Sequence, residues 1–457
     1  MSDKKNSPRA LALKILCRVL KNDNGTGTES GSGYSNILID SAISSSGIDG
    51  ADRGLLTRLV NGVIERKLTL DYIIGTLSSR PVAKLDPDVL NLLRMGIYQL
   101  HFMERIPPHA AVNETVELAK PSGRGFVNAI LRSCQRRGDI PLPEISKQNS
   151  PEYCFSIRYS VSEGLCRELI RIYGKKTAES ILAASFDGSS TTMTLRVNTL
   201  RTDRKTLGEQ LAGKGFVCRD TRFSPWGIKI LSGGGIPSAV TDGLAFVQDE
   251  ASQLCALALE LYPECSLLDA CACPGSKSFS SALLMENRGS VTSCDLHESK
   301  LPLISDEAKK LGITVIKPVC RDSSAPFEDG RKVDRVICDV PCSGFGVMAK
   351  KPEIRYRSPD DTRDLPDLQY RILCASAESL APDGILVYST CTILPAENEE
   401  NARRFLAEHP DFAPVPFEFH SDNGNENISA PEGMLTLLPG QYGTDGFFIA
   451  KFTRKKV

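Results

Sequence analysis

The feature that most limits how this chain can fold is the alternation of apolar, strand-like segments with helical segments from residue 244 onward. Strands are predicted at 266–270, 290–295, 314–317, 333–339 and 385–389, with helices near 249–262, 277–286, 299–311, 367–381 and 396–408. Such alternation predicts a parallel sheet with helices on both faces. Strands at 434–438 and 446–452 are expected to close one edge. Residues 409–433, rich in Pro, Asn and Ser, are expected to form a surface insertion.

The first 140 residues have apolar side chains at helical spacing and predict a helical bundle. Helices are predicted at 10–21, 51–78, 86–104, 109–120 and 124–137, and the Gly- and Ser-rich residues 24–35 predict a flexible loop. A linker at 138–151 precedes a helix that starts at the Ser160–Glu163 capping box and ends at Gly174. Strands at 192–198, 216 and 228–231, with a helix at 203–213, complete a small α+β module. The expected domains are therefore all-α at 1–140, α+β at 150–240 and α/β at 241–457.

The amino-acid composition indicates a globular protein and argues against several other classes. A chain with 41% hydrophobic and 24% charged residues is globular rather than disordered. No apolar run reaches the ~18 residues of a transmembrane helix, and Lys14 and Arg18 interrupt the only segment that resembles a signal peptide. The 15 cysteines are irregularly spaced and include no pair of CxxC motifs. They are expected to be reduced thiols in the cytoplasm, without a metal site.

In a parallel sheet of this kind, ligands bind at the carboxyl ends of the strands. The first predicted strand leads into 271–277, where Gly275 allows the backbone to approach a ligand closely. The second ends at Asp295, 20 residues beyond Gly275, where a carboxylate can accept both hydroxyls of a ribose. Because GxGxxG is absent, an adenosine cofactor without phosphates, such as S-adenosylmethionine, is favoured over a dinucleotide. Simple turn chemistry is the alternative.

Two later strands bring cysteines to the same edge. Asp339 and Cys342 follow one strand in the sequence Asp-Val-Pro-Cys-Ser-Gly, and Cys391 follows the next in Tyr-Ser-Thr-Cys-Thr. A free cysteine is ordinarily a small buried apolar residue. Two cysteines at a ligand-binding edge instead favour thiol chemistry.

With these motifs the chain resembles the RNA cytosine-5 methyltransferases, in particular the group that acts on small-subunit ribosomal RNA and has an N-terminal domain related to the antitermination factor NusB. The two cysteine motifs are the specific part of the resemblance, which covers nearly the whole chain. It also rests on residues 51–58, 105–117, 125–132, 195–200, 247–252, 438–440 and 444–450. The resemblance implies a NusB-like RNA-binding domain at 1–140 and a Rossmann-like class I methyltransferase domain at 241–457, with S-adenosylmethionine as cofactor.

The resemblance further implies methylation of C5 of a cytosine in 16S ribosomal RNA through a covalent bond between a cysteine and C6. Cys391 would be the nucleophile, Cys342 would assist release of the adduct, and Asp339 would face the N3/N4 edge of the base. The implied cofactor-binding residues are Cys271, Ala272, Cys273, Pro274, Gly275, Ser276, Lys277, Asp295, Asp322 and Asp339. Asp295 would bind the ribose and Asp322 would lie near the adenine. Lys277 is equally suited to reach the substrate or to point to solvent.

Cys273, Ser276 and Ser278 depart from the family's usual loop, Ala-Ala-Pro-Gly-Gly-Lys-Thr. A serine at 276 would weaken cofactor binding if that position requires a positive φ. The charged residues after the first cysteine motif, Lys350, Lys351, Arg355, Tyr356 and Arg357, are expected to contact RNA, with a solvated loop as the alternative.

The formal net charge of −1 is the sum of a basic first part and an acidic second part of the chain. Residues 1–201 contain 27 Lys and Arg against 20 Asp and Glu, a net of +7, and the other 256 residues contain 28 against 36, a net of −8. This division favours an RNA-holding front half and an acidic catalytic half. The expected partner is small-subunit ribosomal RNA, with no membrane, and the expected state is a monomer. A transfer-RNA cytosine-5 methyltransferase and a non-catalytic RNA-binding or antitermination factor are the alternatives.

Overall fold

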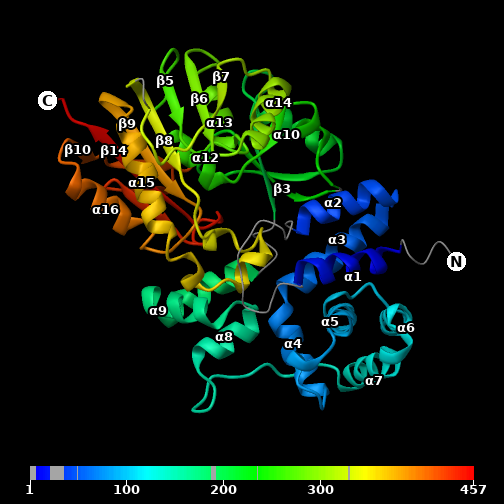
Figure 1. Ribbon diagram of the computed structural model, residues 1–457. Helices are drawn as coiled ribbons and strands as arrows, with labels where there is room; N and C mark the ends of the chain where they lie inside the picture. Colours follow the sequence, from blue (N-terminus) through cyan, green and yellow to red (C-terminus); the bar gives the residue numbers. More distant parts are fainter. Residues whose placement is uncertain are drawn as a thin grey trace. The chain divides into compact units, whose positions relative to one another are not determined.

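The computed structural model describes residues 7–20, 35–48, 50–186, 192–233, 235–327 and 330–456. The loop predicted at 24–35 lies outside the described residues, apart from Ser35, which begins a helix. The chain divides into two compact units. The helical unit comprises Met1–Phe186 and Lys351–Asp361, and the sheet unit comprises Asp187–Lys350 and Thr362–Val457 (Figure 1). The chain therefore crosses between the units three times.

The helical unit confirms the predicted bundle. Its helices are α1 (Pro8–Val19), α2 (Ser35–Ser46), α3 (Gly50–Glu65), α4 (Lys67–Leu77), η3 (Val82–Lys84), α5 (Pro87–Phe102), α6 (Pro108–Leu118), α7 (Pro121–Arg137), α8 (Pro151–Tyr159) and α9 (Glu163–Phe186). The start of α5 illustrates the local cause: the Asp86 carboxylate accepts the N–H groups of Asp88 and Val89, and Pro87 occupies the first helical position. The helices enclose one apolar core in which Leu59, Leu93 and Leu131 are fully buried.

The helix predicted to end at Gly174 is interrupted there, as expected, and a second helical segment that the sequence analysis did not predict follows directly. Gly174 has φ +73°, and helical structure resumes and continues to Phe186. The segment after Gly174 is helical because its apolar residues Ala178, Ile181 and Leu182 recur at helical spacing and are buried. The glycine therefore marks a kink between two helical segments.

The segment 351–361 forms short 3₁₀ turns, η7 (Pro352–Tyr356) and the start of η8 (Pro359–Thr362), that belong to the helical unit. Arg355 is fully buried and donates to the carbonyl oxygens of Tyr159 and Ser185, near the ends of α8 and α9. Terminal helix carbonyls lack intrahelical donors, so the guanidinium satisfies them. The predicted RNA contact of Arg355 is therefore wrong.

Tyr356 is likewise engaged inside the helical unit. Its hydroxyl lies 3.0 Å from Ser160 Oγ, accepts the backbone N–H of Lys67 at 3.2 Å, and donates to the carbonyl oxygen of Ile64. The Lys67 ammonium lies 4.0 Å from the centre of its ring. The predicted RNA contact of Tyr356 is therefore wrong, because its ring and hydroxyl are engaged within the helical unit. Lys351 and Arg357 are exposed.

The sheet unit begins with a four-stranded antiparallel sheet in the order β2-β3-β1-β4. The elements are β1 (Met193–Val197), α10 (Arg204–Gly213), β2 (Val217–Asp220), β3 (Gly227–Ser232), α11 (Ser238–Thr241) and β4 (Ala245–Val247). Leu195, Ile228 and Leu207 form its core, so α10 covers one face. β1, α10 and β3 lie where the sequence predicts them, whereas β2 begins one residue after the predicted Phe216, and α11 and β4 were not predicted.

The main sheet has the order β10-β14-β9-β8-β5-β6-β7, with β13 also paired to β14. Its elements are α12 (Glu250–Leu257), β5 (Ser266–Asp269), α13 (Ser276–Leu284), β6 (Ser290–Asp295), η5 (Glu298–Lys300), α14 (Leu301–Leu311), β7 (Ile316–Cys320), β8 (Val333–Asp339), η6 (Phe345–Val347), α15 (Leu365–Ala377), β9 (Leu380–Thr390), α16 (Glu399–Glu408), β13 (Met434–Leu437) and β14 (Phe447–Arg454). Strands β5 to β9 are parallel, and β14 runs antiparallel to β9. The predicted Rossmann-like architecture is confirmed.

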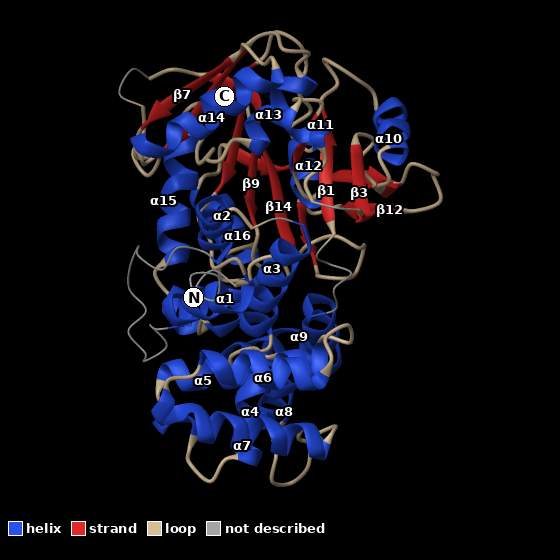
Figure 2. Ribbon diagram, turned by 90° about the vertical axis from the view of Figure 1, so that its right-hand side faces the viewer, coloured by secondary structure: helices blue, strands red, loops and turns tan. Residues whose placement is uncertain are grey.

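Helices cover both faces of this sheet (Figure 2). Leu254, Phe279 and Ile304 from α12, α13 and α14 pack on one face, and Leu373 and Phe405 from α15 and α16 pack on the other. The strand order reverses between β5 and β8, which form adjacent parallel neighbours. Such a reversal creates the crevice where ligands bind.

The expected surface insertion at 409–433 is wrong in one respect, because it contains strands. β10 (Phe412–Pro414) pairs with β14, and β11 (Phe417–His420) pairs with β12 (Asn427–Ala430). Phe419 and Ile428 are buried in the core of the sheet unit. The alternating apolar residues of this segment therefore determine its secondary structure, although its overall composition is polar.

Candidate active site

The two cysteines predicted from the strand ends lie next to each other. Asp339, the last residue of β8, is in register with Ser389 of β9. Cys342 and Cys391 follow these strands, and their Sγ atoms are 3.2 Å apart. Parallel neighbours that end together thus bring residues 49 positions apart into contact.

Backbone hydrogen bonds hold the two cysteine-bearing loops together. The N–H of Gly346 donates to the carbonyl oxygen of Cys391 at 3.0 Å, and the N–H of Gly446 donates to that of Gly346 at 2.9 Å. A Cβ atom at Gly346 would lie 2.1 Å from the Gly446 oxygen and 2.8 Å from the Cys391 oxygen. Only glycine permits this approach, which fixes the loop after Cys342.

Asp339 and Lys277 form a buried ion pair beside the cysteines. The Lys277 Nζ lies 2.6 Å from Asp339 Oδ2 and donates to Ser252 Oγ at 3.3 Å, while Ser389 donates to Asp339 Oδ1 at 2.9 Å. Burial alone would lower the pKa of Lys277, but the Asp339 charge raises it above its ordinary value. Lys277 thus points toward Asp339 and not to solvent, one of the two orientations left open by the sequence.

Glu397 is a neighbour of Cys342 that the sequence did not reveal. Its side chain is 1% exposed, and Oε2 accepts the backbone N–H of Ser343 at 2.9 Å and the Gln369 amide at 2.7 Å. Gln369 also donates to the carbonyl oxygen of Pro341 at 2.9 Å. The carboxylate therefore fixes the peptide bond that joins Cys342 to Ser343. An acidic residue six positions beyond Cys391, directly after the apolar residues 393–396, was the available signal.

The predicted cofactor loop begins where β5 ends. Gly275 has φ +112°, and a Cβ there would lie 2.4 Å from the Phe279 ring. Ser276 is the first residue of α13 and does not have a positive φ, so a serine is not strained at this position. The hydroxyl of Ser278 donates to Asp269 Oδ2 at 2.6 Å. Burial raises the pKa of Asp269 to about 7.

Asp295 is the last residue of β6, and Asp322 lies two residues beyond the end of the neighbouring β7, at the same edge. Asp295 is in register with Cys320 of β7, and the N–H of Arg321 donates to its carbonyl oxygen at 2.9 Å. Asp295 is partly exposed and accepts the N–H of His297, while hydrogen bonds from Ser324 lower the pKa of the exposed Asp322. Two accessible carboxylates beside a glycine turn suit the hydroxyls and amino group of an adenosine cofactor, so the residues present fit it.

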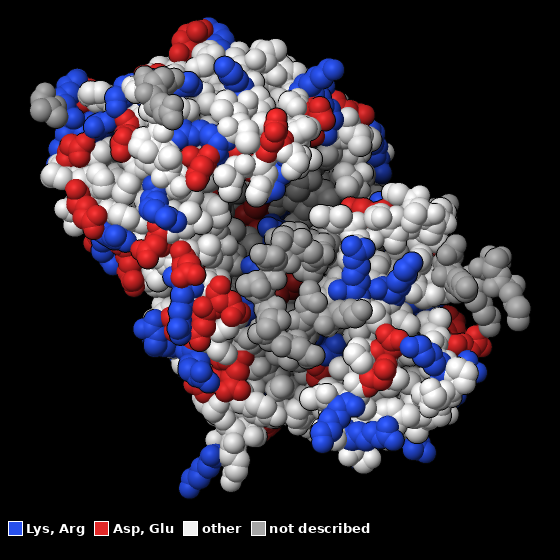
Figure 3. Space-filling view, in the orientation of Figure 1, with Lys and Arg blue, Asp and Glu red and all other residues white. Residues whose placement is uncertain are grey.

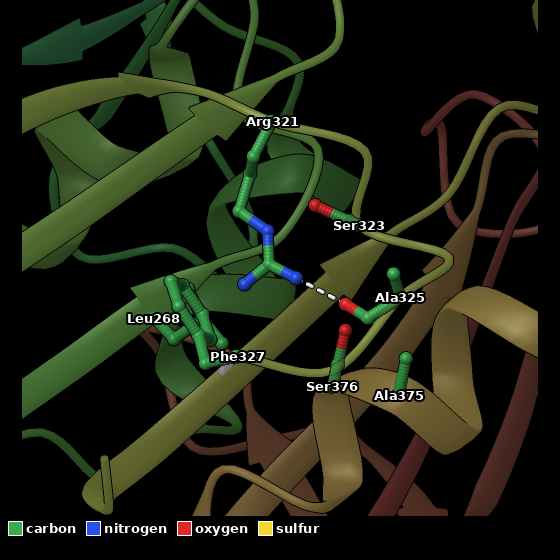
Figure 4. A pocket seen from close by; sticks show the side chains of 7 residues that line it. All are labelled: Leu268, Arg321, Ser323, Ala325, Phe327, Ala375 and Ser376. Atoms are coloured by element: carbon green, nitrogen blue, oxygen red, sulfur yellow. Dashed lines mark hydrogen bonds between the residues drawn. The ribbon is translucent and has the colours of Figure 1, made fainter. Parts of the chain in front are cut away.

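A small pocket lies behind this edge, on the α15 side of the sheet (Figure 4). It is lined by Leu268, Arg321, Ser323, Ala325, Phe327, Ala375 and Ser376. It has no room for a water-sized molecule, so it is not a ligand pocket. Arg321 donates to the Ala325 carbonyl oxygen, and Ser323 donates to that of Ala270 at 2.5 Å. These contacts hold the loop around Asp322 against β5.

A second buried charge cluster joins three segments near the cysteine loops. Lys350 Nζ lies 2.7 Å from both Asp249 Oδ1 and Asp445 Oδ2. Burial raises the pKa of Asp445 to about 7; for Asp249 the opposing charge of Lys350 outweighs burial and lowers the pKa. The predicted RNA contact of Lys350 is therefore wrong, because its ammonium is held between two carboxylates. The acids inside 247–252 and 444–450 were the available signal.

Two classes of feature are absent from the part of the chain that the structure describes. None of its helices is both long and apolar enough to span a membrane. No group of three or more His, Cys, Asp or Glu side chains among those residues could hold a metal ion.

Comparison with known proteins agrees with this architecture. Family models match residues 256–453 (16S rRNA methyltransferase RsmB/F), 6–136 (NusB family) and 163–236 (a ferredoxin-like domain of RsmF/B-like methyltransferases). A Bacillus subtilis protein named probable ribosomal RNA small subunit methyltransferase B is 37% identical over 99% of this chain and 100% of its own.

Solved structures give the same result for the fold. The crystal structure of PH0851 has a TM-score of 0.78 and 24% identity, covering 98% of this chain and 99% of that one. A methyltransferase homolog from Pyrococcus horikoshii has a TM-score of 0.58 and 27% identity over 68% of this chain and all of its own. The full-length identity to the Bacillus protein and the match of the RsmB/F family model show that the chain belongs to the RsmB/F family of ribosomal RNA small subunit methyltransferases.

Proposed function

We propose that this methyltransferase modifies C5 of a cytosine in 16S ribosomal RNA through a covalent cysteine–C6 adduct. The observation that carries the proposal is the 3.2 Å separation of the Cys342 and Cys391 sulfurs beside the Asp339–Lys277 ion pair. Methylation of C5 by this route requires a thiolate that can add to C6 and later leave, and a second group that assists the departure. An adjacent pair of thiols supplies both.

In the proposed reaction the Cys391 thiolate forms a bond to C6, and the ring electrons move so that C5 becomes nucleophilic. S-adenosylmethionine supplies the methyl group that C5 takes, and S-adenosylhomocysteine leaves. Water then takes the C5 proton, the electron pair of the C5–H bond restores the ring double bond, and the C6–sulfur bond breaks with its electron pair returning to Cys391. Cys342 lies against Cys391 and is assigned to this release step, and Asp339 is assigned to the N3/N4 edge of the base. Hydrogen bonds from Lys277 and Ser389 fix the orientation of the Asp339 carboxylate.

The cofactor is assigned to the edge formed by β5, β6 and β7. Residues 271–277 supply a turn that allows close backbone approach, Asp295 is placed to accept the ribose hydroxyls, and Asp322 lies just beyond the end of the next strand for the adenine. Asp339 is assigned to both cofactor and base. Cys273 is partly exposed at this edge, and its Sγ atom lies 3.9 Å from the Lys300 carbonyl oxygen.

The helical domain, proposed at 1–140, is assigned to RNA binding, with 150–240 as a connecting module and 241–457 as the catalytic domain. The helical unit holds 28 Lys and Arg against 22 Asp and Glu, a net of +6, and the sheet unit holds 27 against 34, a net of −7. Figure 3 shows groups of Lys and Arg side chains over the helical unit and intermixed charges over the sheet unit. A cytoplasmic monomer remains our expectation.

The role of each cysteine is tested by substitution. Cys391→Ala is expected to abolish methyl transfer, because no nucleophile then adds to C6. Cys342→Ala is expected to form the adduct but not release it, so a protein–RNA species that resists denaturing electrophoresis should accumulate. Cys218→Ala, on β2 of the four-stranded sheet, is the matched control and should leave both readouts unchanged.

Methylation by Cys391→Ala would contradict the assignment of the nucleophile. Bisulfite mapping of ribosomal and transfer RNA from a deletion strain identifies the substrate. Loss of a single cytosine modification in 16S ribosomal RNA supports the proposal, loss in transfer RNA favours the alternative substrate, and no loss in either favours a binding-only protein.

A further inference from the structure

Two thiols in contact are chemically alike, so their surroundings must decide which one ionises. Cys342 and Cys391 lie 3.2 Å apart, and ionising one makes it harder to ionise the other. Near neutral pH the pair therefore holds at most one thiolate. The proposed reaction, on which this inference rests, needs that thiolate on Cys391.

A negative charge lies on the Cys342 side. The Glu397 carboxylate accepts the N–H of Ser343, the residue that follows Cys342, and its Oε1 atom has no hydrogen-bond partner among the described residues. No Lys or Arg in the described part of the chain forms an ion pair with it. The contact with Cys391, then burial, and then charges that include Glu397 and Asp339 raise the pKa of Cys342 well above its ordinary value.

The other charges near the pair do not cancel this asymmetry. The groups facing Cys342 are Asp339, Tyr388, Cys391 and Glu397. Asp339 is neutralised by Lys277 at 2.6 Å, and the Tyr388 hydroxyl donates to the Glu397 carbonyl oxygen at 2.5 Å. Lys277 in turn lies within electrostatic range of Cys391. Cys342 therefore lies beside an anion that no Lys or Arg of the described residues balances, whereas Cys391 lies within electrostatic range of the balanced Lys277–Asp339 pair.

We propose that Glu397 is a positioning residue that gives the two thiols different roles: it fixes the peptide after Cys342 and holds a negative charge there, so that Cys342 stays a thiol and Cys391 carries the thiolate. The Cys342 S–H can then donate to the Cys391 sulfur. When Cys391 bonds to C6, its sulfur loses the negative charge that this hydrogen bond stabilises. As the C6–sulfur bond breaks, the Cys342 S–H again donates to the departing Cys391 thiolate and so assists its release.

The test measures the reactivity of each cysteine in the free, full-length protein. Iodoacetamide is added in brief pulses between pH 6 and 10, and alkylation of Cys342 and Cys391 is quantified separately by tandem mass spectrometry. In the wild type, Cys391 should react first. Glu397→Gln keeps an oxygen to accept the Ser343 N–H but removes the charge, so alkylation of Cys342 at pH 7.5 should accelerate by roughly tenfold.

Two further variants separate charge from structure. Glu400→Gln, the same change at an exposed position of α16, should leave both alkylation profiles unchanged. Glu397→Asp retains the charge and should preserve the wild-type order of reactivity, whereas a purely structural role would make it resemble Glu397→Gln. If Glu397→Gln fails to fold, the order measured in Glu397→Asp decides, and a reversed order contradicts the proposal.

A Cys342 that alkylates before Cys391 in the wild type, or at an unchanged rate in folded Glu397→Gln, overturns the proposal. Because neither RNA nor cofactor is present, these outcomes do not depend on methylation. Failure of the proposed function would appear instead as methyl transfer by Cys391→Ala.

Discussion

At the scale of single residues, the site combines groups whose proton affinities differ from those in the unfolded chain. Asp269 is fully buried at the end of β5, and burial raises its pKa to about 7 although Ser278 donates to it. The folded protein therefore holds a proton that the unfolded chain loses near pH 4. Its contribution to stability is present at low pH and is lost as the pH rises through about 7.

Asp269→Asn removes this dependence, because the amide does not titrate. Relative to the wild type, the variant should gain about 2 kcal/mol of unfolding free energy between pH 5.5 and pH 8. The measurement is urea unfolding at both pH values, followed by fluorescence of Trp226, the single tryptophan, which lies in the sheet unit. An identical pH dependence in the two proteins would mean that Asp269 ionises normally in the fold.

At the scale of elements, ion pairs and short segments connect parts of the chain that the sequence separates widely. Lys350 joins the turn before α12, the end of the loop after Cys342 and the turn before β14 through Asp249 and Asp445. Removing one partner from a buried charge cluster leaves the others unpaired, which costs more than the ion pair itself contributes. The cluster therefore locks the register of these turns.

Lys350→Met should destabilise the sheet unit by about 3–5 kcal/mol at pH 8, since two buried carboxylates lose their cation. The loss should shrink at pH 5, where Asp445, with a pKa of about 7, is already protonated. Trp226 fluorescence during urea unfolding measures both values. Lys309→Met, an exposed position of α14, is the control and should differ little from the wild type. Equal destabilisation at the two pH values would show that packing, and not charge, is responsible.

Regular elements and strand-end motifs were predictable because each depends on local spacing. β6 and β8 have the predicted bounds, and Cys342 and Cys391 meet because two parallel strands end together. Arg355 and Glu397 were not predictable in this way. Both are charged residues buried by partners distant in sequence, the carbonyl oxygen of Ser185 and the N–H of Ser343, and no local pattern encodes those partners.

At the scale of the whole molecule, charge is divided between the two units, with +6 on the helical unit and −7 on the sheet unit. Contacts between basic side chains and phosphates release counterions, so their number determines how affinity depends on salt. On α7, Arg136 and Arg137 are exposed, at the end of a helix whose other face is buried in the core.

Replacing Arg136 and Arg137 with glutamine should weaken binding to ribosomal RNA and reduce the slope of log affinity against log salt by about 1–2. The matched control replaces Arg403 and Arg404, on α16 of the acidic unit, and should preserve the slope. Filter binding at several salt concentrations provides the measurement. A slope that changes only in the control would place the RNA contacts on the sheet unit.

The three crossings of the chain between the units bear on how such a protein could arise. Residues 351–361 complete the helical unit, yet they are encoded between the two cysteine motifs of the catalytic unit. A gene fusion at the amino terminus could supply Met1–Phe186 but not the buried Arg355 and Tyr356 contacts. The helical unit is therefore not encoded by one continuous segment, and transfer of Met1–Phe186 alone would leave behind the contacts that residues 351–361 make. A proteolytic cut directly after Phe186 would sever Met1–Phe186 from the rest of the chain, yet residues 351–361, which pack with that fragment, would stay covalently joined to the sheet unit.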